Sequence, residues 1–105
     1  MNQSALQQSV ALLIDRIEEE MRATGFWQSE PPTPAQLAFT KAFAMDTMAF
    51  AQWLQFVFIP RVREAIASND FPSSSSVGAQ AVREFDGEPQ AGRLVSLLSQ
   101  FDALF

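Results

Sequence analysis

Cysteine, histidine and tyrosine are absent from this chain of 105 residues, and its only lysine is Lys41. Without cysteine there is no disulfide and no thiolate site for a metal or for catalysis. Without histidine the commonest general base and metal ligand is missing. Acidic residues outnumber basic ones 12 to 7, for a net charge of −5, which argues against direct binding to nucleic-acid phosphates. We therefore expect a non-enzymatic protein with no metal and no cofactor.

Apolar residues are abundant by contrast. They make up 48% of the chain and include ten phenylalanines, while only 18% of residues are charged. A disordered chain has the opposite composition, and this length suits one domain, residues 1–105. The start, MNQSALQQSV, lacks the basic segment and unbroken apolar run of a signal peptide, so we expect a cytoplasmic protein.

Apolar residues recur at helical spacing, and strict alternation typical of strands is absent. The pattern predicts an all-α fold, a compact bundle of four to five helices around a central apolar, Pro-kinked helix. Ser4–Thr24 forms the first helix, which Gly25 can terminate. Thr33 caps a short second helix that starts at Pro34 and ends near Thr40 or Ala44, with Leu37 facing inward. The remaining helices are expected at 48–68, 77–85 and 89–103, with Asn69 ending the first of these and Ser76 capping the next.

The central helix is the most informative segment. Residues 47–60 carry no charge, but the run is shorter than the roughly 20 apolar residues of a membrane span. Pro60 within the helix removes a backbone hydrogen bond and predicts a kink. Because apolar side chains surround this helix almost completely, it is either the hub of the bundle or incompletely covered by its own chain.

Two faces of this helix differ in their polar content. A face with Phe50, Trp53 and Leu54 is expected to enter the core. The opposite face combines aromatic, amide and guanidinium groups, which are enriched at protein interfaces. We predict that this face is a partly exposed strip that binds a protein partner or a second copy of the chain. Its residues, called the docking strip below, are Gln52, Gln55, Phe56, Ile59 and Arg63.

Arg61 falls on the apolar face of a straight helix. A buried guanidinium needs a partner, so either the Pro60 kink turns it outward or a carboxylate meets it. Asp46 is the first candidate for that carboxylate. We interpret such a pair as structural.

Other polar groups give weaker signals. Asp15, Glu18 and Glu19 share a helix face and could hold a hard cation such as magnesium, but acidic helix faces are usually just solvated. Lys41 is interpreted as a surface lysine. The serines at 73–76 have no histidine to activate them and are interpreted as a solvated connector.

Residues 45–62, MDTMAFAQWLQFVFIPRV, contain Asp46-Thr47, then Gln52-Trp53-Leu54-Gln55-Phe56, then Ile59-Pro60-Arg61. This series resembles the YqcC-like family of small bacterial proteins. The resemblance makes Asp46, Thr47, Trp53, Leu54, Pro60 and Arg61 the structural motif and implies a compact helical fold, but no established activity. Members of that family are often encoded beside a tRNA pseudouridine synthase, which implies a partner role near RNA modification. Ala49 and Ala51 depart from the family pattern and leave the start of the central helix open by one turn.

Three functions remain open. The first is an interaction or accessory module that binds a partner, or itself, through the aromatic helix around residues 48–63. The second is a carrier of a small molecule or lipid, with an apolar cavity among the phenylalanines. The third is an accessory protein of a tRNA pseudouridine synthase. An exposed apolar strip would favour the first, and a ligand-sized cavity would favour the second.

Overall fold

The computed structural model describes residues 4–105, and these contain helices and no strand. Residues 1–3, which precede the predicted first helix, lie outside the described residues. The elements in chain order are α1 (Ala5–Ala23), α2 (Pro34–Leu37), a 3₁₀ turn (Ala42–Ala44), α3 (Phe50–Trp53), a π turn (Leu54–Phe58), α4 (Ile59–Ser68), α5 (Val77–Glu84), a second 3₁₀ turn (Pro89–Ala91) and α6 (Gly92–Asp102). Because α3, the π turn and α4 follow one another without a break, the predicted all-α bundle of four to five helices is confirmed.

The first helix follows its sequence signals closely. The Gln7 backbone N–H donates to Ser4 Oγ over 3.0 Å, and the Ser4 N–H donates to Gln7 Oε1 over 2.8 Å. This capping box fixes the start of α1. At its end Gly25 has φ +83°, and the Phe26 N–H donates to the Met21 carbonyl oxygen over 3.0 Å, the geometry of a glycine-terminated helix.

The second helix is shorter than predicted. Thr33 does cap it, because the Gln36 N–H donates to Thr33 Oγ1 over 3.2 Å. It ends at Leu37, and the prediction that Leu37 faces inward is wrong, since 49% of this residue is exposed. A helix of one turn buries no face of its own. Thr47 instead holds the segment in place by donating from Oγ1 to the Gln36 carbonyl oxygen over 2.7 Å.

The central helix starts at Phe50, two residues later than predicted, and ends as predicted at Asn69 in a left-handed conformation with φ +52°. Proline in a helix clashes with the carbonyl four residues earlier, here that of Phe56. A π turn lies just before Pro60, and in it the Ile59 N–H donates to the Leu54 carbonyl oxygen. A widened turn of this kind relieves the clash while the helix continues through the proline.

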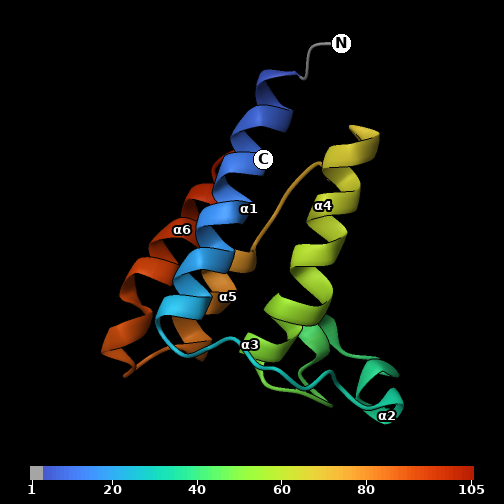
Figure 1. Ribbon diagram of the computed structural model, residues 1–105, viewed down its shortest axis with the longest axis vertical. Helices are drawn as coiled ribbons and strands as arrows, with labels where there is room; N and C mark the ends of the chain where they lie inside the picture. Colours follow the sequence, from blue (N-terminus) through green and yellow to red (C-terminus); the bar gives the residue numbers. More distant parts are fainter. Residues whose placement is uncertain (1–3) are drawn as a thin grey trace.

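The helices form two groups that the core joins (Figure 1). The first group is α1, α5 and α6, in which α6 packs against both α1 and α5. The second group is the continuous helix of α3, the π turn and α4, and its α4 part packs against α1. The connector of residues 69–76 runs from the end of α4 back to the start of α5, across the space between the groups. The cavity considered below lies against this connector.

Aromatic rings bind the groups together. Trp53, which is 8% exposed, stacks on Phe50 and Phe58 with ring centroids 5.8 and 5.5 Å apart. Phe58 then meets Phe101 of α6 edge to face at 5.1 Å. These contacts extend into one continuous array of rings: Phe26, Phe85, Phe50, Phe43, Trp53, Phe58, Phe101, Phe105 and Phe71. Most of the phenylalanines therefore pack in the core or against it.

Within residues 4–105, none of the helices has both the length and the apolar character needed to cross a membrane.

Candidate functional site

The structure places much of the predicted docking strip in contact with the rest of the chain. Gln55 is 6% exposed and Ile59 is 3% exposed, so the prediction that they lie on an open surface is wrong. The Gln55 side chain is committed to residue 28 of the loop after α1. The Gln28 backbone N–H donates to Gln55 Oε1 over 2.8 Å, and Gln55 Nε2 donates to the Gln28 carbonyl oxygen over 2.7 Å. Both functions of a buried amide are thereby satisfied within the fold.

Gln52 and Phe56 are half-buried. Gln52 Oε1 accepts from the Ala49 backbone N–H over 2.9 Å, so this side chain caps the start of α3 from within. Its Nε2 also lies 3.5 Å from Gln28 Oε1. Phe56 is the one partly exposed residue of the docking strip whose side chain makes no hydrogen bond or ion pair within the described chain.

Arg63 reaches across to α1. Its Nη1 lies 3.0 Å from Asp15 Oδ1, and its Nη2 lies 3.0 Å from Glu18 Oε1. Partial burial opposes the charged form, but hydrogen bonds to Glu18 and Asp15 outweigh it and raise the pKa of the Arg63 guanidinium. Two of the three carboxylates weighed as a magnesium site thus hold an arginine. The acidic face of α1 is in part a seam to α4.

Asp46 and Arg61 do not form the pair that the sequence suggested. Asp46 Oδ2 accepts from the Thr40 backbone N–H over 3.1 Å and from Thr40 Oγ1 over 3.0 Å, and Asp46 Oδ1 accepts from the Lys41 N–H over 3.3 Å. The hydrogen bond from the Thr40 backbone N–H leads these in lowering the pKa of the Asp46 carboxyl. Asp46 therefore orders the turn between α2 and α3.

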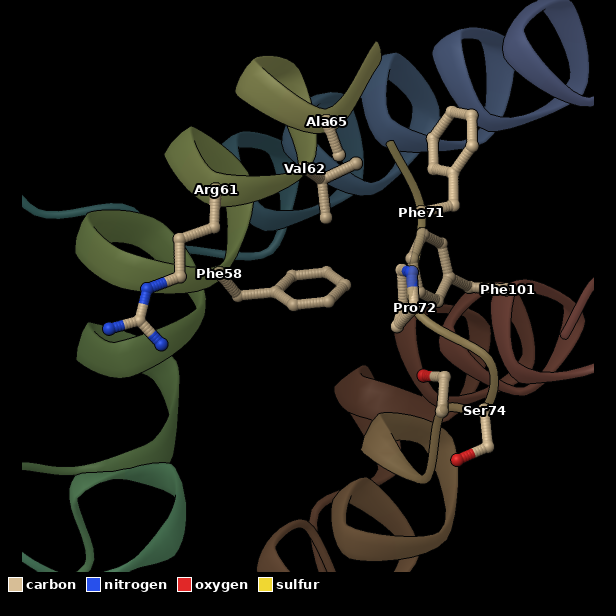
Figure 2. Close-up of a pocket in the computed structure, with 9 residues that line it drawn as sticks. Phe58, Arg61, Val62, Ala65, Phe71, Pro72, Ser74 and Phe101 are labelled. Atoms are coloured by element: carbon tan, nitrogen blue, oxygen red, sulfur yellow. The ribbon is translucent and has the colours of Figure 1, made fainter. Parts of the chain in front are cut away.

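Arg61 is exposed, and no ion pair reaches it from any of residues 4–105. It stands instead at the edge of an apolar cavity of about 180 Å³ (Figure 2). The cavity lies between α4, the connector and α6, and its apolar walls come from Phe58, Val62, Ala65, Phe71, Pro72 and Phe101. In Figure 2 Phe58 points toward Phe101 across the opening, while the Arg61 guanidinium points away from Phe71.

A second hollow lies at the turn between α5 and α6. It is larger, about 400 Å³, but it is a shallow surface depression. Val82, which is 57% exposed, and the carboxylate-bearing residues Asp86 and Glu88 border it.

Sequence reasoning missed the residue that organises the connector. Asp102 of α6 accepts through Oδ2 from the Gly78 backbone N–H over 2.8 Å, and through Oδ1 from Ser75 Oγ over 2.6 Å. The predicted cap residue, Ser76, makes no side-chain cap bond to α5. A carboxylate from another helix caps α5 in its place. No local spacing signals this contact, because the partners lie 24 and 27 residues apart.

Comparison with known proteins now identifies the family. Residues 9–104 match the family DUF446, described as tRNA pseudouridine synthase C. The chain belongs to this family. It is 31% identical over 99 residues to the uncharacterized protein YqcC of Escherichia coli K12, covering 91% of this chain and 90% of that protein. The YqcC-like family predicted from residues 45–62 is thereby confirmed.

Two further relatives extend the comparison. An uncharacterized protein of Haemophilus influenzae is 29% identical over 77 residues, covering 70% of this chain and 73% of that protein. A tRNA pseudouridine synthase C of Pectobacterium carotovorum is 40% identical over 52 residues, which are 50% of this chain but 14% of that protein. No solved structure matches the chain significantly.

Proposed function

We propose that this chain is a non-enzymatic accessory module that binds a tRNA pseudouridine synthase. One observation carries the proposal: half of the chain resembles a small part of a protein that bears the synthase's name. When an enzyme and an accessory domain share one chain, each is present at a high effective concentration near the other. When they are separate proteins, they need a specific interface to associate.

The composition supports an accessory role rather than a catalytic one. The chain has no histidine, cysteine or tyrosine, and its one lysine, Lys41, is exposed at the turn before α3. Its net charge of −5 favours contact with the enzyme over contact with tRNA. An enzyme that binds tRNA presents cationic surface, which an acidic protein can approach favourably.

The carrier alternative has less support. The apolar cavity beside Arg61 is partly open to solvent and, at about 180 Å³, is smaller than sites for small molecules, which are about 300–1,000 Å³. The larger hollow is open to solvent.

The docking strip as a whole is a poor surface for binding a partner, because Gln55 and Ile59 are buried. Within the aromatic helix the exposed residues are Ala49, Pro60, Arg61 and Arg63. Arg63 is paired with α1, whereas Arg61 lies beside the cavity.

Sedimentation velocity on the two purified proteins from the same bacterium tests the proposal. We expect a new, faster boundary when this chain is mixed with its tRNA pseudouridine synthase C at micromolar concentration. The matched control replaces this chain by an unrelated acidic helical protein of similar size, which should leave the synthase boundary unchanged. Two independent boundaries for the cognate pair at about 50 μM, far above a typical specific Kd, would contradict the proposal.

A further inference from the structure

The cavity beside Arg61 is partly open to solvent, and its lining is almost entirely apolar. A large apolar side chain of a partner can be buried in such a hollow. Here three phenylalanines, Phe58, Phe71 and Phe101, face a volume of about 180 Å³ that the described chain does not fill. The volume is close to that of an apolar cavity of about 150 Å³ in another protein that accepts benzene. It therefore has room for one aromatic ring or one branched side chain.

The walls of this cavity are held from both sides. Phe71 contacts Phe105 with ring centroids 5.9 Å apart, which fixes one end of the connector. Ser75 Oγ donates to Asp102 over 2.6 Å, which fixes the other end. Phe58 is held between Trp53 and Phe101. A site whose walls are already ordered loses little entropy when it is filled.

An arginine without an ion pair lies at the edge of the cavity. Arg22, Arg63 and Arg93 each lie within 3.4 Å of a carboxylate of α1. Arg61, like Arg16 and Arg83, has no such partner among residues 4–105, but of these three exposed arginines only Arg61 borders the cavity. On a chain of net charge −5 an incoming carboxylate is repelled in general, so a site next to an unneutralised guanidinium selects where it can dock.

We infer that this cavity is the anchor point for the protein partner, taking one Phe or Leu side chain from a segment whose neighbouring Asp or Glu pairs with Arg61. The inference rests on the proposed function, because it names the chemistry of the partner segment. The size of the cavity points to a side chain rather than a free small molecule. A single large apolar residue in a desolvated pocket, flanked by a charged contact, is the usual form of an interface hot spot.

Methyl and amide NMR spectra of the full chain test this with defined probes. Two blocked six-residue peptides are titrated, identical in sequence except that Phe is followed by Glu in one and by Lys in the other. We expect saturable shifts at Val62 and Ala65 with the Phe-Glu peptide. The Phe-Lys peptide should bind about fivefold more weakly, which is the effect of one exposed ion pair, and Arg61→Glu should reverse this preference.

Filling the cavity provides the second arm. Ala65→Phe, on its wall, should abolish the shifts at Val62, and Ser74→Phe on the exposed connector should do the same if Ala65→Phe disturbs folding. Ala67→Phe, on the exposed side of α4, and Arg83→Glu, on α5, are matched controls that should bind as the parent chain does.

Several outcomes overturn the inference. They are no saturable shift at millimolar peptide, equal binding of both peptides, shifts centred on Leu12 or Val82, and concentration-dependent shifts at Val62 without peptide, which would identify a second copy as the occupant. Because no synthase is present, these results are separate from the sedimentation test. If the synthase complex forms but neither peptide binds the cavity, the proposed function stands and the anchor site is wrong. If a peptide binds but no synthase complex forms, the anchor site stands and the synthase is not the partner.

Discussion

Whether a polar residue of this protein is buried or exposed depends on the hydrogen-bond partners that its side chain finds. Gln55 lies on the helical face that the sequence marks as polar, yet it is buried, because its amide matches the N–H and carbonyl of Gln28. A periodicity argument ranks glutamine as a surface residue and does not see a partner 27 residues away. The prediction that Gln55 is exposed was therefore wrong because the groups that its side chain bonds are distant in the sequence.

Replacing Gln55 by alanine should leave the Gln28 backbone N–H and carbonyl without their partners. We expect a loss of about 1–3 kcal/mol in the free energy of unfolding, the usual range for breaking buried hydrogen bonds. Urea unfolding measures it. Gln52→Ala, which removes a half-exposed cap, is the matched comparison and should cost less; an equal or larger loss there would contradict the assignment of Gln55 as the buried tie.

Asp46 gives a prediction about pH. Hydrogen bonds led by that from the Thr40 backbone N–H lower the pKa of its carboxyl below 3.8 in the folded chain. A lowered pKa means that the ionised form stabilises the fold above the unfolded-state value, and that this contribution is lost as pH falls through the folded-state value. The stability difference between the parent chain and Asp46→Asn should be constant from pH 7 to about 5 and should shrink as the pH falls further, through the lowered pKa of the folded chain.

That difference is obtained from thermal unfolding of both proteins across the pH range, in which the other carboxyls titrate alike and cancel. A difference that stays constant down to pH 2 would show that the Asp46 carboxylate does not hold the Thr40 turn.

At the scale of elements, close approach of α5 to α6 depends on one glycine. A Cβ on Gly78 would lie 2.6 Å from Ser99 Cα, so both helix backbones would have to separate. We expect Gly78→Ala to destabilise the fold by about 1–3 kcal/mol, as overpacking does. Gly92, at the start of α6, has nothing within 4 Å of such a Cβ, and Gly92→Ala should be neutral or stabilise by about 0.5 kcal/mol. Thermal unfolding of the two variants decides it, and equal effects would contradict this packing.

Elements with local signals could be predicted, and those fixed from a distance could not. The apolar spacing of α1, its Gly25 terminus, the Thr33 cap and the Asn69 terminus all follow from neighbours within a turn. The turn before α3 does not, since Phe43 and Ala44 adopt φ of +56° and +54° where no glycine signals a break. Asp46 and the aromatic contacts of Phe43 hold that strained turn in place.

For the molecule as a whole, the sequence predicted the helical bundle and the family, but misplaced the surface. It assigned the docking strip to an open face, while the seam formed by Arg63 with Asp15 and Glu18, and the bonds of Gln55, close most of that face. Such closure depends on residues 48 and 45 positions apart, which no helical wheel contains. The cavity beside Arg61 likewise arises from three elements that only the folded chain brings together.

One measurement tests the central claim directly: amide and methyl NMR mapping of this chain as its own bacterium's tRNA pseudouridine synthase C is added. The account predicts that signals of Arg61, Val62, Ala65 and the connector at 71–75 shift or broaden first, while those of Gln55 and Ile59 keep their positions. A perturbed face centred on Leu12 and Val82, or a spectrum that does not change at saturating synthase, would contradict it.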